Sequence, residues 1–268
     1  MDAGPPSAHS GAGSPLRCPS NHSFDQARHG YVQLGAGPLA HGGDTAEMIA
    51  ARGRFLAAGH FEPITTAVRE AAGSGWRGGL VVDVGAGTGH HLASVLDGLP
   101  DAWGLAVDAS KSAARSSARA HSRSDAIVAD VWRPLPLADE STGVLLDIFA
   151  PRNAPEFARV LRSDGVLAVV TPAADHLATL VDALGLLTVD PGKPSRLAET
   201  LVDWFDPVAT TPYRWIMELT HDDVDTVVAM GPSAWHADPA ALGAGIATLP
   251  RTVHVTASVT VGVYRARR

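Results

Sequence analysis

LVVDVGAGTGH, running from Leu80 to His90, is the most informative stretch of this 268-residue chain. It begins with four apolar residues around one acid, which indicates a strand buried on both faces. Gly85, Gly87 and Gly89 then allow backbone of positive φ and a close approach to a ligand, because no Cβ intervenes. The residues after them have the pattern of a helix N-terminus, which favours anions. We predict a strand, a tight ligand-binding loop and a helix.

The spacing of these glycines separates two kinds of cofactor loop. A dinucleotide-binding loop has the pattern G-x-G-x-x-G, and its last position is occupied here by His90. The pattern D-x-G-x-G-x-G from Asp83 to Gly89 instead resembles motif I of the class I S-adenosylmethionine (SAM) methyltransferases. That resemblance implies that the acid and the glycines border the methionine end of the cofactor. An ordinary strand-to-helix turn, in which glycines serve only close packing, is the alternative.

Two more acids follow apolar runs. Asp108 ends the run Ala102–Val107, a little over twenty residues beyond Gly85, where the carboxylate of a second strand can bind ribose hydroxyls. Asp130 follows a third apolar run and would lie at the lip of the sheet. The resemblance to SAM methyltransferases implies that this position is near the adenine amino group. For Asp130 an ordinary surface position at a strand end is the alternative.

Composition is that of a globular protein, with 46% apolar and 18% charged residues. No apolar run approaches the roughly 18 residues of a membrane span, and the first twenty residues lack the apolar core of a secretory signal. We therefore expect no membrane partner. The single cysteine, Cys18, excludes an internal disulfide framework and agrees with a reducing, cytoplasmic location.

The net charge of −7 argues against indiscriminate nucleic-acid binding, because phosphate binding requires clustered Lys and Arg. RNA contact is therefore expected only where basic residues gather locally. Lys111, Arg115, Arg119 and Arg123 recur every four residues, which places them on one helical face. That face is either a solvated surface or a ridge that contacts phosphates.

The alternation of strands and helices after Leu80 predicts an α/β fold with a mostly parallel sheet. Asp44 is expected to cap a helix that ends near Gly59, and a second helix, 64–72, runs into a glycine-rich linker at 73–79. Strands are expected near 80–84, 103–107, 126–129, 143–149, 165–171, 213–220 and 253–264. Helices are expected near 89–98, 111–121, 153–162, 175–184, 197–205, 222–230 and 239–249.

Several short segments outside motif I are specific to one family. They include CPSNHSFDQARHGYV at 18–32, GDTAEMIAAR at 43–52, FLAAGH at 55–60, FAPRN at 149–153, TPAADHL at 171–177 and MGPSAWH at 230–236. From Cys18 onward the chain resembles the RlmA-type 23S rRNA (guanine-N1)-methyltransferases, in particular the TlrB-like macrolide-resistance members of actinomycetes. The resemblance implies a class I SAM-dependent methyltransferase domain, Rossmann-like with a mostly parallel seven-stranded sheet, joined to a small N-terminal module.

The resemblance also assigns site residues by position. Asp108 would bind the ribose and Asp130 would lie near adenine, while Phe61 and His176 would also border SAM. The full set of expected cofactor positions is Phe61, Asp83, Gly85, Gly87, Thr88, Gly89, Asp108, Asp130 and His176. Contact with RNA is expected from Arg28, Arg52 and Arg54.

Four parts of the chain follow from these patterns. Residues 1–16 are expected to be a disordered N-terminus, 17–42 a zinc-finger-like RNA-recognition module, 43–79 a helical connector and 80–268 the SAM domain. The family holds zinc with three cysteines and a histidine, of which only Cys18 and His22 are present here. Because a closed structural zinc site needs four ligands, we expect a degenerate module without metal.

The leading hypothesis is a cytoplasmic enzyme that methylates N1 of one guanine in a 23S rRNA hairpin lining the peptide exit tunnel, with reduced macrolide binding as the result. A small-molecule methyltransferase of antibiotic biosynthesis and a non-catalytic SAM- or rRNA-binding protein are the alternatives. Asp147, at the end of the fourth strand, is a candidate general base by place alone, and a homodimer stays open.

Overall fold

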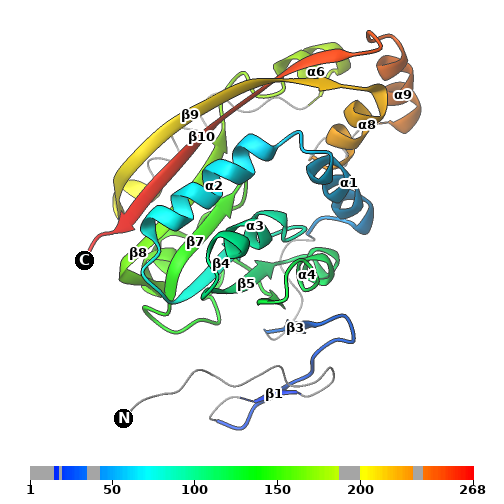
Figure 1. Ribbon diagram of the computed structural model, residues 1–268. Helices are drawn as coiled ribbons and strands as arrows, with labels where there is room; N and C mark the ends of the chain where they lie inside the picture. Colours follow the sequence, from blue (N-terminus) through cyan, green and yellow to red (C-terminus); the bar gives the residue numbers. More distant parts are fainter. Residues whose placement is uncertain (1–14, 18–19, 35–42, 187–199, 232–237) are drawn as a thin grey trace.

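The centre of the molecule is a twisted eight-stranded sheet, seen in a computed structural model that describes residues 15–17, 20–34, 43–186, 200–231 and 238–268 (Figure 1). The strand order is β3-β6-β5-β4-β7-β8-β10-β9. The bounds are β3 Tyr31–Gln33, β4 Leu80–Val84, β5 Trp103–Asp108, β6 Ser124–Val128, β7 Thr142–Ile148, β8 Leu161–Pro172, β9 Phe205–Leu219 and β10 Val253–Ala266.

The sheet is parallel from β3 to β8, and β10 runs antiparallel to both β8 and β9. Its seven strands from β4 onward correspond to the seven expected from the sequence. The eighth, β3, comes from the N-terminal segment and pairs with β6, with Tyr31 opposite Ala126. The segment expected as a separate recognition module therefore contributes an edge strand to the main sheet.

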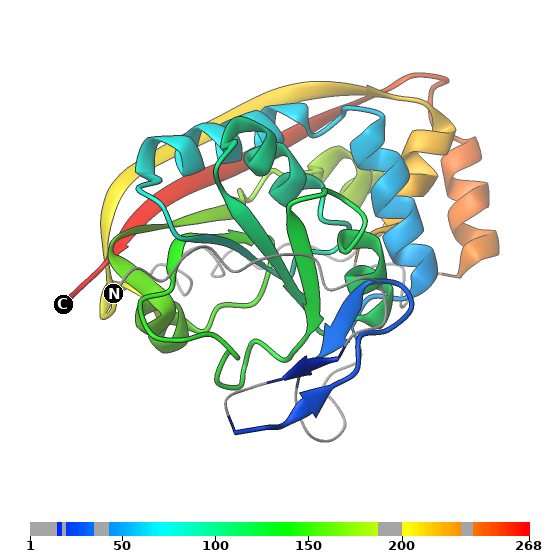
Figure 2. The same ribbon diagram turned by 60° about the horizontal axis from the view of Figure 1, so that its bottom comes forward.

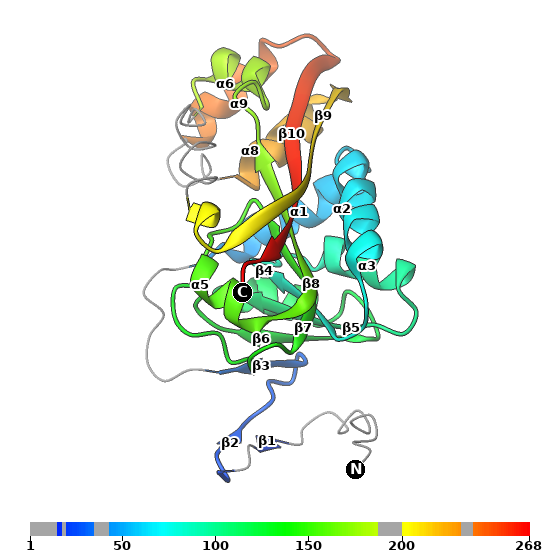
Figure 3. The ribbon, with the colours of Figure 1, turned by 90° about the vertical axis from the view of Figure 1, so that its left-hand side faces the viewer.

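Helices cover both faces of the sheet. Helices α2 and α3 lie on one face and α5 on the other, while α1, α8 and α9 gather at one end (Figures 1 and 3). The bounds are α1 Ala46–Ala57, α2 Glu62–Gly75, α3 His90–Gly98, α4 Lys111–Ser117, α5 Ala154–Val160, α6 Ala178–Leu184, α8 His221–Ala229 and α9 Pro239–Ala247. None of the helices in the described residues is long and apolar enough to cross a bilayer.

Two apolar cores result from this arrangement. Neighbouring residues of β7 alternate between them, with Leu146 in the core under α2 and α3 and Leu145 in the core under α5. Both side chains are fully buried, and each such burial contributes roughly 1.5–3 kcal/mol. A strand with both faces buried needs the continuous apolar pattern that the sequence shows.

A small hairpin precedes the main sheet. Strands β1 (Leu16–Arg17) and β2 (Ser23–Phe24) form an antiparallel pair of their own, which lies beyond β3 and apart from the large sheet (Figures 2 and 3). Of the N-terminus expected to be disordered, residues 1–14 lie outside the described residues, and Leu16 belongs to β1.

Three sequence-based boundaries are corrected by the structure. Thr45, and not Asp44, caps α1, because its hydroxyl accepts a hydrogen bond from the Met48 amide at 3.2 Å. Helix α2 continues to Gly75, within the expected linker, since a glycine there lets the helix approach Val166 of β8. Strand β9 begins at Phe205 and not near 213; its residues 206–212 are exposed and therefore lack an apolar alternation.

Candidate functional site

The glycine-rich loop follows β4 and ends at the N-terminus of α3, as the sequence predicted. Gly85, Gly87 and Gly89 all have positive φ, at 69°, 54° and 78°. At Gly87 the space is also closed, because a Cβ would lie 2.9 Å from the Arg52 guanidinium. Thr88 is half-buried, and its carbonyl accepts a hydrogen bond from the Ser116 hydroxyl. A side chain at position 87 would therefore strain the backbone and displace a neighbour at once.

Asp108 lies beside this loop at the end of β5. One carboxylate oxygen accepts the Gly87 amide at 2.9 Å and the other accepts the Ser110 amide at 2.8 Å. Burial raises the pKa of Asp108, and these two hydrogen bonds partly oppose the rise. An ionised carboxylate can accept about four hydrogen bonds, so two acceptor positions remain for hydroxyl groups of a ligand.

Asp130 lies at the end of the neighbouring strand β6. Its carboxylate accepts the Trp132 amide at 3.0 Å, and its backbone neighbour Ala129 donates to the Asp108 carbonyl. The two acids predicted to bind opposite ends of a nucleoside therefore follow adjacent strands. Asp83 is different, because it lies beneath the loop and only 2% of it is exposed. Burial raises the pKa of Asp83 well above its usual value, and the charges of Asp108 and Asp147 add to the rise.

Asp147 is buried as well, which corrects its role as a candidate general base. Its side chain has no exposed surface and lies 3.1 Å from Arg152, itself 5% exposed. Burial raises the pKa of Asp147 to about 8, against the opposing charge of Arg152. A carboxylate enclosed with its own cation cannot reach a substrate at the mouth of the site.

An aromatic cluster adjoins the loop. Phe61, at the start of α2, lies 5.9 Å from the His176 ring and 6.4 Å from the Phe149 ring, and it meets Trp215 edge-on. Phe61 is buried, whereas Phe149 is 42% exposed. His176 accepts the Ser258 amide, and burial lowers the pKa of His176 to about 4, so the ring is neutral near pH 7. The cluster is therefore uncharged, with one ring open to solvent.

Phe149 also has an unusual backbone. Its φ of +56° is rare for a residue with a Cβ, and such strain costs about 1–3 kcal/mol and is concentrated at functional sites. The next residue, Ala150, closes over the glycine loop, since a Cβ on Gly85 would lie 2.6 Å from the Ala150 Cβ. The exposed ring of Phe149 therefore stands directly before the residue that touches the loop.

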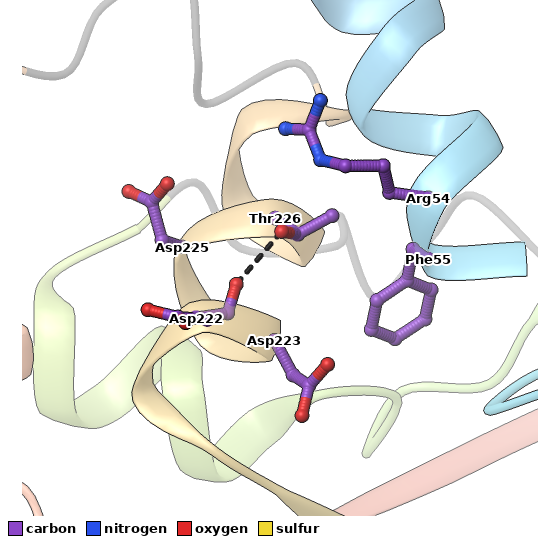
Figure 4. Close-up of a pocket in the computed structure, with 6 residues that line it drawn as sticks. All are labelled: Arg54, Phe55, Asp222, Asp223, Asp225 and Thr226. Atoms are coloured by element: carbon purple, nitrogen blue, oxygen red, sulfur yellow. Dashed lines mark hydrogen bonds between the residues drawn. The ribbon is translucent and has the colours of Figure 1, made fainter. Parts of the chain in front are cut away.

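Arg52 and Arg54, expected to contact RNA, have other neighbours in the structure. Arg52 forms an ion pair with Asp44 at 2.6 Å and donates to the Met230 carbonyl at 2.9 Å. Arg54 lines a pocket of about 410 Å³ between α1 and α8, with Phe55, Asp222, Asp223, Asp225 and Thr226 (Figure 4). Three carboxylates make this pocket unsuited to a phosphate.

Arg28 lies in a basic cluster. Its guanidinium is 3.0 Å from one ring nitrogen of His29, and the guanidinium of Arg119 is 2.6 Å from the other. Burial lowers the pKa of His29, and the charges of Arg115, Arg28 and Arg119 lower it further. Arg123, expected on the same ridge as Arg115 and Arg119, instead donates to the carbonyls of Leu96, Leu99 and Ala102. The basic surface therefore consists of Arg28 from the N-terminal segment with Arg115 and Arg119 from α4 and the turn after it. Arg123 is not part of it.

Comparison with known proteins settles the family. A protein of Micromonospora griseorubida is 53% identical over 98% of this chain and 92% of its own length, and carries the name of a 23S rRNA (guanine-N1)-methyltransferase. The 23S rRNA (guanine(748)-N1)-methyltransferase of Streptomyces fradiae is 51% identical over 93% of this chain and 90% of its own length. The chain belongs to the 23S rRNA (guanine-N1)-methyltransferase family. No protein-family model matches it.

Comparison with solved structures identifies the fold of this chain. A protein of Anabaena variabilis, named as a methyltransferase from an antibiotic biosynthesis pathway, superposes with a TM-score of 0.51 at 16% identity, covering 76% of this chain and 96% of that one. The predicted class I methyltransferase fold is thereby confirmed. The names of its relatives confirm the predicted methyltransferase.

The residues present suit SAM. A Cβ on Gly87 would displace the Arg52 guanidinium, and Asp108 keeps acceptor positions suited to a ribose diol. When bound, SAM supplies an electrophilic methyl group, and what this chain adds is position, because an in-line nucleophile must be held close to that methyl. The assignment of each of these residues to a particular part of SAM is a proposal.

The metal prediction stays a prediction. Cys18 lies outside the described residues, as does His9, and His22 is exposed. Within the described ranges no group of three or more His, Cys, Asp or Glu is placed to hold a metal.

Sequence reasoning missed two features of the site. Asp44 was considered only as a helix cap and Phe149 only as part of a longer family segment, and neither was assigned to the cofactor site. A signal for Phe149 existed, since an aromatic directly after the fourth strand falls at the carboxyl edge of a parallel sheet, where ligands bind. No signal in the sequence links Asp44 and Arg52 to Gly87, because their contact depends on how α1 packs.

Proposed function

We propose that this enzyme methylates N1 of one guanine in a hairpin of 23S rRNA that lines the peptide exit tunnel, and so reduces macrolide binding. The observation that carries the proposal is the identity of 51% with a guanine-748 N1-methyltransferase over 93% of this chain. That coverage leaves about 19 residues unmatched, so it reaches into the segment before the SAM domain. An enzyme that acts on ribosomes works in the cytoplasm.

The basic cluster supports an RNA substrate. Arg28, Arg115 and Arg119 are exposed and surround His29, although the chain as a whole is acidic. Three like charges held together are unfavourable without a counter-ion, and phosphates supply one. We assign this cluster, with the N-terminal segment up to residue 42, to contact with the RNA backbone.

The exposed ring of Phe149 supports a planar substrate next to the cofactor loop. Stacking of a base on an aromatic side chain contributes roughly 1–3 kcal/mol, and specific RNA recognition often uses bases turned out of a loop. Phe149→Leu is expected to raise the RNA concentration for half-maximal rate by roughly 5- to 150-fold, whereas Phe149→Tyr stays near wild type. Trp204→Leu is the matched control, because Trp204 is 44% exposed and lies immediately before β9.

Primer extension on 23S rRNA tests the proposal directly. RNA from a host that lacks the modification, carrying the gene or an empty vector, is expected to differ by one new stop at a guanine. In parallel, methyl transfer from labelled SAM is measured with 23S rRNA and with small molecules. Transfer to small molecules alone would favour a biosynthetic enzyme, and binding of rRNA without transfer would favour a non-catalytic protein.

The charge of the RNA surface is tested separately. Arg115→Ala and Arg119→Ala should each weaken RNA binding and reduce the slope of log affinity against log salt by about 1. Arg162→Ala removes an exposed arginine that pairs with Asp164 elsewhere on the surface and should leave that slope unchanged. Equal effects of all three changes would show that the cluster is not the RNA surface.

A further inference from the structure

Arg52 lies directly against the cofactor loop. A Cβ on Gly87 would lie 2.9 Å from Arg52 Nη1 and 3.5 Å from Arg52 Cδ. The charge of Arg52 also acts on Asp108 and on His91, the second residue of α3. The guanidinium therefore faces Gly87. This glycine belongs to the loop that resembles motif I, which borders the methionine end of SAM in that class of enzyme.

Arg52 forms an ion pair with the Asp44 carboxylate at this position. Its Nη1 pairs with the Asp44 carboxylate at 2.6 Å, and its Nη2 donates to the Met230 carbonyl at 2.9 Å. The backbone of Asp44 is fixed too, since its carbonyl accepts the Ser110 hydroxyl at 2.6 Å. The two charged side chains are 28% and 30% exposed, so a small ligand can reach both.

Three histidines and one further arginine near the loop are neutral or already enclosed. Burial lowers the pKa of His91 to about 3 and of His176 to about 4, and it lowers the pKa of His90. Arg152 is buried against Asp147. Of these neighbours, Arg52 keeps a permanent charge that solvent reaches, and it stands beside a carboxylate of opposite charge.

We propose that Arg52 and Asp44 together bind the amino-acid end of SAM, the guanidinium taking the carboxylate and the Asp44 carboxylate taking the ammonium. A zwitterion matches a fixed pair of opposite charges, and a guanidinium binds a carboxylate through two parallel hydrogen bonds. This assignment replaces the expectation that Arg52 contacts RNA. It rests on the SAM-dependent reaction and is independent of which nucleotide is methylated.

Two ligands isolate the amino-acid end. S-adenosylhomocysteine carries the α-amino and carboxylate groups, whereas 5′-methylthioadenosine has the same nucleoside and a thioether but lacks both. Calorimetry on the full-length protein measures the affinity for each ligand. Arg52→Gln is expected to weaken S-adenosylhomocysteine by roughly 10- to 100-fold and to change 5′-methylthioadenosine by less than about twofold. Asp44→Asn should weaken the same ligand selectively, and Arg52→Lys should retain part of the affinity, because a lysine keeps the charge and loses the fork.

Arg54→Gln is the matched control. It removes the same charge two residues along α1, in the pocket beside α8, and should change neither affinity. The midpoint of thermal unfolding shows which variants are folded. If Arg52→Gln does not fold, Arg52→Lys is used in its place to test the proposal. Equal weakening of both ligands would mean that Arg52 only braces α1 against α8, and unchanged affinities would mean that it is a bystander. Either result overturns the proposal, whereas a wild-type protein that binds neither ligand would contradict the cofactor assignment itself.

Discussion

Gly87→Val tests the cofactor loop most sharply. The residue has a φ of +54°, and this region costs a residue with a Cβ about 1–2 kcal/mol, with β-branched side chains the least tolerated. The new Cβ would also lie 2.9 Å from the Arg52 guanidinium, which must move. At about 2–4 °C per kcal/mol for a protein of this size, the strain lowers the unfolding midpoint by roughly 2–8 °C, while binding of S-adenosylhomocysteine and methyl transfer are lost.

Gly78→Ala separates strain from contact. Gly78 has a φ of +102°, and a Cβ there would meet nothing within 4 Å. Its variant should lose a similar few degrees by thermal unfolding and keep full affinity for S-adenosylhomocysteine by calorimetry. A Gly87→Val enzyme with wild-type affinity and rate would refute the assignment of this loop to the cofactor. Loss of binding in both variants would instead point to general destabilisation.

Three further changes test single groups. Asp108→Ala should weaken the binding of S-adenosylhomocysteine by about 1.5–3 kcal/mol, the range for a hydrogen bond to a charged group. An unchanged affinity by calorimetry would contradict the role of Asp108. Because burial lowers the pKa of His176 from 6.5 to about 4, the unfolded chain takes up a proton that the folded chain does not, and the free energy of unfolding should fall as the pH falls from about 6.5 to about 4. Urea unfolding of His176→Asn should show a shallower fall, and an identical pH profile would contradict the burial of that ring. Metal analysis should find far less than one zinc per chain, and Cys18→Ser should fold and transfer methyl groups normally, whereas a zinc-dependent module would unfold.

Local chemistry explains what the sequence could predict. The glycine loop, Asp108 and Asp130 all belong to strand ends, where apolar runs and turn residues leave a clear pattern. The order of strands and helices after Leu80 follows from the same patterns. The sequence alone does not fix the cap of α1, because Asp44 and Thr45 are both good capping residues. Only the hydrogen bond to Met48 distinguishes them.

Features that depend on distant packing could not be read from the chain. Arg119 and Arg123 continue the four-residue spacing of basic residues in the sequence, but α4 ends at Ser117, so neither lies on that helix. Arg119 contacts His29, whereas Arg123 donates to the carbonyls of Leu96, Leu99 and Ala102. Strand β3 has only three residues, too few for an apolar alternation, and forms because β6 offers a free edge. Arg52 looks like a surface cation in the sequence because its partners lie in other segments.

The hydrogen bond between Arg52 and the Met230 carbonyl joins residues 178 apart in the chain. At synthesis rates of roughly 5–20 residues per second, about 9–36 s separate the addition of these two residues to a growing polypeptide. For most of that interval, once residue 89 has been added, the nascent chain contains the glycine loop but lacks α8. Ribosome-bound chains arrested before residue 230 should therefore hold no cofactor. An enzyme whose substrate is ribosomal RNA would then gain its activity only late in its own translation, when it is close to leaving the ribosome that made it.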